Sequence, residues 1–249
     1  MRMFLRKLHR WLGLLMAVQI IAWMASGLYF SIFPIEEIRG SHLTRKSEPL
    51  KAEGLSQMGS PVEVKRELDR HFGPGWELTS LSLVSKGDQM AWRVDGKVDG
   101  VVFRRLLPGD GSGILPALSS QEAAQAAQGW LLDNAEVQAT EWLESTPPGS
   151  EIRGRNFPVW KITFEEPESL NLYLDPWTGE ILASRTTRWR IFDFFWMLHV
   201  MDFENRDDFN HPLLQIAAFL GLLIALSGVI FWAMTTSVFR KKRRAPGTS

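Results

Sequence analysis

The chain of 249 residues contains no cysteine. This absence excludes a disulfide framework, a thiol nucleophile, cysteine-ligated zinc, iron–sulfur clusters, covalently attached c-type haem and an N-terminal lipidated cysteine. The sequence also has no phosphate-binding loop, no zinc-protease helix and no nucleophile elbow. These absences favour a protein that is not an enzyme.

Two long stretches carry no charged residue, at 11–33 and 213–238. A helix rises about 1.5 Å per residue, so roughly 20 apolar residues cross a hydrocarbon core of about 30 Å. Basic residues crowd the outer flanks, residues 1–10 and 239–249, and such residues stay on the cytoplasmic side. The sequence therefore predicts a two-pass protein of the bacterial inner membrane, with cytoplasmic termini and a periplasmic region at 34–188.

The first span has one alternative interpretation, which is a cleaved signal peptide. Ala25, Ser26 and Gly27 are small residues at about the right distance for cleavage. The apolar run continues to Phe33, however, well past a usual signal core. An uncleaved anchor is therefore favoured.

The formal net charge of zero hides a segregation of charge. The two flanks hold nine of the 28 basic residues and no acid, so the segment from Pro34 to Pro212 carries 19 basic and 28 acidic residues. An acidic central region is a poor partner for nucleic acid, because phosphate binding needs a basic surface. The basic flanks are instead suited to anionic lipid headgroups of the bilayer.

The central region predicts an α+β fold with an internal duplication. Residues 61–72 have helical spacing and are followed by three stretches that alternate as strands do. Ser119 and Glu122 form a capping-box start for a second helix, which more strands follow. We therefore predict two helix-plus-antiparallel-sheet units, at about 60–116 and 119–185, between the membrane helices.

The second unit resembles the C-terminal hairpin of a PepSY domain, with a Trp-led strand, a strand ending in Asp and a Thr-Gly-Glu turn. The matching residues are Trp160, Tyr173, Asp175, Thr178, Gly179 and Glu180. The Leu-His-Arg-Trp-Leu-Gly start of the first span is similar to PepSY-associated transmembrane proteins. So is the later Leu-His segment, followed by a helix with Ser-Gly near its end. This resemblance implies a non-enzymatic accessory protein whose PepSY-like units bind or modulate a partner membrane system.

Some larger members of the family that the chain resembles are haem-carrying ferric-siderophore reductases, which makes transmembrane electron transfer the alternative function. His9 and His199 occupy the matching Leu-His positions and are the candidate ligands of a haem b. The predicted topology puts them at opposite membrane faces, so only a symmetric dimer would bring two like histidines together. Alternatively, His9 is an anchor at the headgroups, and His199 belongs to an interfacial aromatic segment at 189–203.

The loop before the second span gathers acids that are weak candidates for a metal site. They are Asp202, Glu204, Asp207 and Asp208, together with His211. Their spacing does not fit a calcium loop, which needs a central Gly and a closing Glu. The alternative is a solvated acidic loop in which Asn210 caps the second membrane helix.

Small residues recur at four-residue intervals along both spans. Gly13 with Ala17 and Ala22 with Ser26 share faces of the first span; Ala217, Gly221 and Ala225 share a face of the second. Such faces allow close packing of helices. The packing partner could be the other span, a second copy in a homodimer, or another membrane protein.

Overall fold

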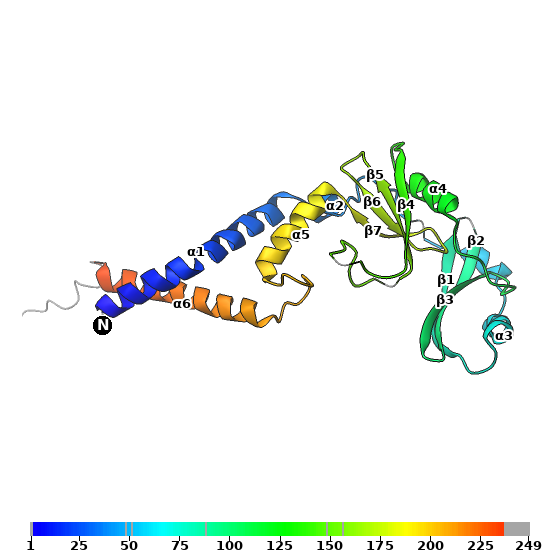
Figure 1. Ribbon diagram of the computed structural model, residues 1–249, viewed down its shortest axis with the longest axis horizontal. Coiled ribbons are helices and arrows are strands. Elements are labelled where there is room, and N and C mark those ends of the chain that lie inside the picture. The colour runs from blue at the N-terminus through cyan, green and yellow to red at the C-terminus, as the bar shows by residue number, and fades with distance from the viewer. Residues whose placement is uncertain are drawn as a thin grey trace, which may run out of the picture. The chain divides into compact units, whose positions relative to one another are not determined.

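The structure is a computed structural model, and it describes residues 2–47, 49–50, 52–87, 89–147, 149–155 and 157–236. The chain divides into two compact units (Figure 1). The first, called here the membrane unit, combines the residues up to Ile35 with those from Arg190 onward; the second, the central unit, is Glu36–Trp189. The predicted basic tail at 239–249 and the end of the second span lie outside the described residues.

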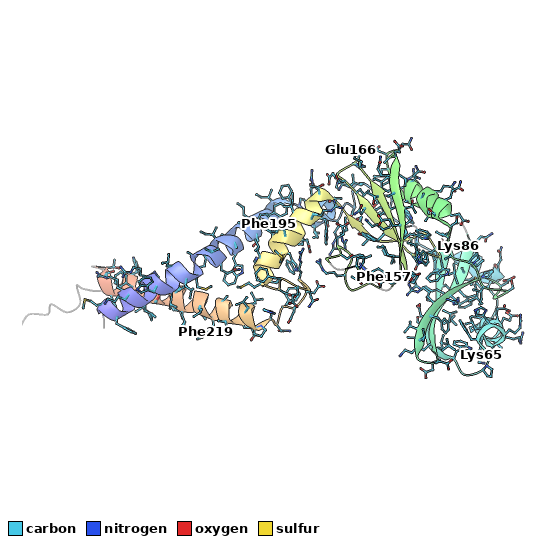
Figure 2. The ribbon with its side chains drawn as sticks, viewed as in Figure 1. Lys65, Lys86, Phe157, Glu166, Phe195 and Phe219 are labelled. Atoms are coloured by element: carbon cyan, nitrogen blue, oxygen red, sulfur yellow. The ribbon has the colours of Figure 1, made fainter. Side chains whose placement is uncertain are left out.

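The membrane unit is built on two long helices that run antiparallel, α1 (Arg2–Ile32) and α6 (Pro212–Thr235) (Figure 1). Arg6–Ile32 and Pro212–Thr235 are long and apolar enough to cross a membrane. In the most apolar 18-residue stretch of each helix, only 11% and 6% of the residues, respectively, are buried within the protein. The core helix of a soluble protein would be mostly buried. Their outward side chains, such as Phe219 on α6 (Figure 2), therefore suit a lipid environment.

The inward face of α1 repeats every seven residues, through His9, Met16, Trp23 and Phe30. This is the period of left-handed helix packing. On α6 the packed face carries Ala217, which is buried, and Gly221, where an added Cβ would lie 3.6 Å from the Trp23 ring. Gly221 thus packs on α1 of the same chain, whereas Ala225, the third small residue of the predicted face, is exposed.

A shorter helix, α5 (Thr187–Val200), carries most of the predicted aromatic segment. Phe195 packs on Tyr29 of α1 with ring centroids 5.3 Å apart, and Phe192 packs on Phe30 at 4.7 Å (Figure 2). The single-turn helix α2 (Ile35–Ile38) follows α1.

In the central unit, α2 is followed by a 3₁₀ turn, η1 (Ala52–Gln57), and then by α3 (Pro61–Phe72), which has the bounds that the sequence pattern predicted. The Ser60 amide donates to Glu63 Oε2 at 2.7 Å, and Gly73 ends the helix with a φ of +78°. Val64 and Leu68 of α3 pack on an antiparallel sheet in the order β1-β2-β3. Its strands are β1 (Glu77–Lys86), β2 (Gln89–Val98) and β3 (Val101–Pro108).

A second helix and sheet follow. Helix α4 (Ser120–Trp130) starts at the capping box predicted from Ser119 and Glu122. Its buried Ala123 and Ala127 pack on an antiparallel sheet in the order β4-β5-β6-β7. The strands are β4 (Val137–Leu143), β5 (Val159–Phe164), β6 (Asn171–Leu174) and β7 (Ile181–Arg185). The predicted fold class, α+β with two membrane helices flanking antiparallel sheets, is confirmed.

The turn between β6 and β7 joins the two sheets. Asp175 Oδ1 accepts hydrogen bonds from the amides of Trp177 and Thr178, each at 3.0 Å, which fixes the turn. The Trp177 side chain then packs among Val84, Ala91 and Leu106 of the first sheet. The PepSY-like turn is thus a joint within the central unit.

Candidate functional site

His9 lies near the start of α1 and contacts the last third of α6. Its Nδ1 is 2.8 Å from the hydroxyl oxygen of Ser227. A Cβ added at Gly228 would lie 3.3 Å from Cε1 of His9, closer than ordinary van der Waals contact. The Ser227-Gly228 pair therefore provides a hydrogen-bond partner and, beside it, the space that the imidazole occupies.

His199, near the end of α5, is held in the same way against α1. Its Nδ1 is 2.7 Å from the hydroxyl oxygen of Ser26, which is fully buried. The imidazole lies parallel to Trp196, with an interplanar angle of 7° and centroids 6.5 Å apart. It is also 5.7 Å from the Phe30 ring.

In both cases the histidine of a Leu-His pair lies against the serine of a Ser-Gly pair on another helix, His9 against Ser227 and His199 against Ser26. Gly228 also faces His9, whereas Gly27 is exposed and a Cβ added there would meet no atom within 4 Å. His9 and Ser26 are 17 residues apart on α1, which is about 25 Å along a helix. The histidines therefore lie at two levels, and one haem cannot join both within a chain.

The end of α5 is capped by polar side chains of the first membrane helix. Gln19 donates to the Leu198 carbonyl oxygen, and the Trp23 indole donates to that of His199, both at 2.9 Å. The last carbonyl groups of a helix have no partner inside it, so outside donors are needed. Gln19, a polar residue in the middle of an apolar span, is explained by this contact.

The surroundings of His9 and His199 meet one requirement of a haem-ligating histidine. A histidine that ligates iron through Nε2 has its Nδ1 held by a second group, and here each Nδ1 is next to a serine hydroxyl. His9 and His199 lie at different levels, so a site that pairs two copies of the same histidine would require a second copy of the chain.

The acidic loop at 201–211 is organised by hydrogen bonds between the Asp202 carboxylate and the loop's own backbone. Asp202 is 4% exposed, and its carboxylate accepts hydrogen bonds from four backbone amides, those of Glu204, Asn205, Asp207 and Asp208. Burial disfavours the charged carboxylate, but these four donors outweigh it and hold the pKa of Asp202 below its ordinary value. Across the part of the chain that the structure describes, no group of three or more His, Asp or Glu side chains converges on a metal position.

The end of this loop differs from the prediction that Asn210 caps α6. The capping residue is His211, whose Nδ1 accepts from the Leu213 amide at 3.3 Å. Asn210 instead accepts from the Gln215 side chain through its backbone carbonyl. Both Asn210 and His211 have side chains that can cap a helix. His211 is the residue that does so, and α6 therefore begins at Pro212, one residue later than a cap at Asn210 would give.

The central unit contains a groove of about 1060 Å³ that both sheet units line. One side has Ser85, Gln89 and Met90 from the first sheet, and the other has Trp130 and Glu180 from the second unit. Arg45 and Lys46 supply positive charge at the same groove. No sequence pattern indicated this groove, because its walls come from segments far apart in the chain.

Glu180, the last residue of the PepSY-like turn, lines this groove and has a raised pKa. Burial raises its pKa, the nearby Asp175 carboxylate raises it further, and Arg93 opposes both. A half-buried carboxylate that costs stability is a feature of binding sites.

Comparison with known proteins identifies one family. The family described as PepSY-associated TM region matches residues 6–248. No curated protein and no solved structure matches the chain.

Proposed function

Because the chain belongs to the PepSY-associated transmembrane family, we propose that it is a two-pass accessory protein of the bacterial inner membrane whose periplasmic central unit binds a partner membrane protein. The groove between the two sheet units carries this proposal. Its lining mixes basic, acidic and neutral polar side chains with methionine and tryptophan, which suits an extended polypeptide more than an apolar small molecule. Met58 and Met90 add adaptable apolar contacts.

Gly129 on α4 allows the groove to be blocked without disturbing the fold. It lines the groove, and a Cβ added there meets no atom within 4 Å. A photo-crosslinking residue at Gln89 is expected to join a discrete partner at native expression. Gly129→Phe should reduce that adduct at least about tenfold, a loss of about 1.4 kcal/mol. Immunoblotting and mass spectrometry of the adduct provide the measurement.

The matched control is Gly129→Ala, which adds a side chain too small to fill the groove. It should leave the adduct unchanged and stabilise the helix by roughly 0.5 kcal/mol, because alanine loses less backbone entropy than glycine. A crosslinker at Val102, which is 71% exposed and outside the groove, should give no adduct. An adduct that Gly129→Phe does not weaken would refute groove binding.

The proposed topology predicts where reporters will be active. A reporter fused before Met1 or after Ser249 should report the cytoplasm, and one inserted near Gly149 should report the periplasm. The basic flanks hold both ends inside, whereas a loop of this length crosses largely regardless of its own charge. If protease added to intact spheroplasts leaves the central unit uncut but cleaves it after lysis, the orientation is reversed.

A second candidate function is transmembrane electron transfer through haem b, and the Nδ1–serine contacts of His9 and His199 favour it. A bound haem would supply one-electron transfer, and Nε2 of either histidine would hold it, with the same histidine of a second copy. We expect a detergent-purified sample to show a sharp Soret band that shifts on reduction and is lost in His9→Ala or His199→Ala. His42→Ala, in the central unit, should keep the band. Absence of the band after expression with adequate haem would exclude this function.

A further inference from the structure

A cluster of arginines lies where the central unit ends, in a region whose overall charge is negative. Arg185 closes β7, and Arg153 and Arg155 lie near enough to alter its ionisation. Both Arg185 and Arg153 have their guanidinium groups over the ring of Trp189, at 4.2 and 6.0 Å from its centroid. Arg155 is exposed. Two cations thus lie over one tryptophan, and a third arginine is close to Arg185.

The backbone of the same unit holds Arg185 in place. Its Nε donates to the Glu151 carbonyl oxygen and an Nη donates to the Ser184 carbonyl oxygen, both at 2.8 Å. Two donors of the guanidinium are therefore used to fix its orientation, and the group has more than two N–H donors. A positioned guanidinium loses less freedom when it binds an anion.

Two arginines and one glutamate act on the charge of Arg185 in this cluster. The acidic group that acts on Arg185 is Glu151, whose carboxylate also accepts hydrogen bonds from Tyr173 and Asn171. Burial lowers the pKa of Arg185 to about 10, with opposing effects of Glu151 and Tyr173 and further lowering by Arg155 and Arg153. Arg185 therefore stays protonated at neutral pH, and an anion would relieve repulsion among the three arginines.

The cluster is close to the membrane unit along the chain. Trp189 is the last residue of the central unit and Arg190 is the first of the returning part of the membrane unit. Arg185 is five residues before Arg190, and five residues span at most about 18 Å. Tryptophan is enriched at the membrane surface, and arginine forms bidentate hydrogen bonds with phosphate.

We propose that Arg153, Arg155 and Arg185, together with Trp189, bind the phosphate of an anionic phospholipid headgroup and so fix the central unit at the bilayer surface. The guanidinium groups contact the phosphodiester, and the tryptophan ring lies against the glycerol region. This site is separate from the groove and does not depend on the partner that the groove binds.

Native mass spectrometry of the full chain in mild detergent tests the proposal, with phosphatidylglycerol and zwitterionic phosphatidylcholine titrated separately. Arg153→Gln/Arg155→Gln should weaken the tightest phosphatidylglycerol site about 30-fold, at roughly fivefold for each arginine. Arg66→Gln/Arg70→Gln on α3 removes the same charge from exposed positions and should change that site less than twofold. Phosphatidylcholine should bind more weakly to the unchanged protein.

Unchanged phosphatidylglycerol binding by the Arg153/Arg155 variant overturns the proposal. So does complete displacement of the lipid by inorganic phosphate at the same concentration, because the site would then be one for a soluble anion. If the double variant does not fold, Arg155→Gln alone decides. Arg155 is exposed, so this change should leave thermal unfolding unaltered and still weaken lipid binding about fivefold.

Discussion

Replacing Trp177 with alanine is expected to destabilise the central unit by about 3–5 kcal/mol, the usual cost of removing a buried aromatic side chain. Trp177 is 8% exposed and packs among Val84, Ala91 and Leu106, one residue from each strand of the first sheet. Trp177 comes from the second helix-and-sheet unit. Its loss therefore removes core contacts and also the packing that joins the two sheets.

This effect is measured by unfolding the full chain in detergent while monitoring far-ultraviolet circular dichroism. That signal reports backbone structure and does not require the tryptophan that is replaced. Trp142→Ala provides the matched control. Trp142 on β4 is 37% exposed and makes an edge contact with Trp160 at 5.0 Å, so about 1 kcal/mol is expected. The groove adduct from Gln89 should also fall in Trp177→Ala, since the groove needs both walls. Equal losses for the two tryptophans would show that Trp177 does not join the sheets.

Local signals in the sequence were sufficient for the elements of the central unit. Helix α3 has the predicted bounds because Pro61 stands at its first turn and Gly73 supplies the left-handed residue that ends it. Helix α4 starts at a capping box that four consecutive residues define. Each of these signals acts over one or two turns of chain, which a periodicity argument can detect.

Contacts between distant segments were not predictable in the same way. His9 and Ser227 are 218 positions apart, and His199 and Ser26 are 173 apart. The repeated Leu-His and Ser-Gly pairs were visible in the sequence, but nothing local indicates that each histidine meets a serine of another helix. Gln19 is a polar residue within an apolar span, and the carbonyl group that it caps comes from a different helix.

The turn at 175–180 shows both situations in one motif. Its Asp and Thr-Gly-Glu pattern was recognisable, and the local hydrogen bonds of Asp175 account for the turn geometry. Two other features depend on how the two helix-and-sheet units of the central unit pack. These are the packing of Trp177 on the first sheet and the position of Glu180 in the groove. Tertiary packing therefore gives this turn its role in the proposed site.

Replacing Asp202 with alanine is expected to cost about 1–3 kcal/mol, because four part-buried hydrogen bonds to a charged acceptor are lost. Asp202 Oδ1 accepts from Glu204 and Asn205 at 3.2 and 3.1 Å, and Oδ2 accepts from Asp207 and Asp208 at 3.1 and 3.2 Å. One side chain thus organises the connection between α5 and α6. Hydrogen exchange of residues 201–211 should become markedly faster in the variant.

Asp202→Asn separates the role of charge from that of shape. Its amide can accept through one oxygen but not through nitrogen, so its stability should lie between those of the wild type and Asp202→Ala. In the wild type the pKa of Asp202 is below its unfolded value, so its contribution is complete above about pH 4 and is lost as the pH falls through the folded-state pKa. Asp202→Asn should not show that acid-dependent loss. Equal stability of Asp202→Ala and the wild type, or an identical acid response of Asp202→Asn, would show that this carboxylate does not hold the loop.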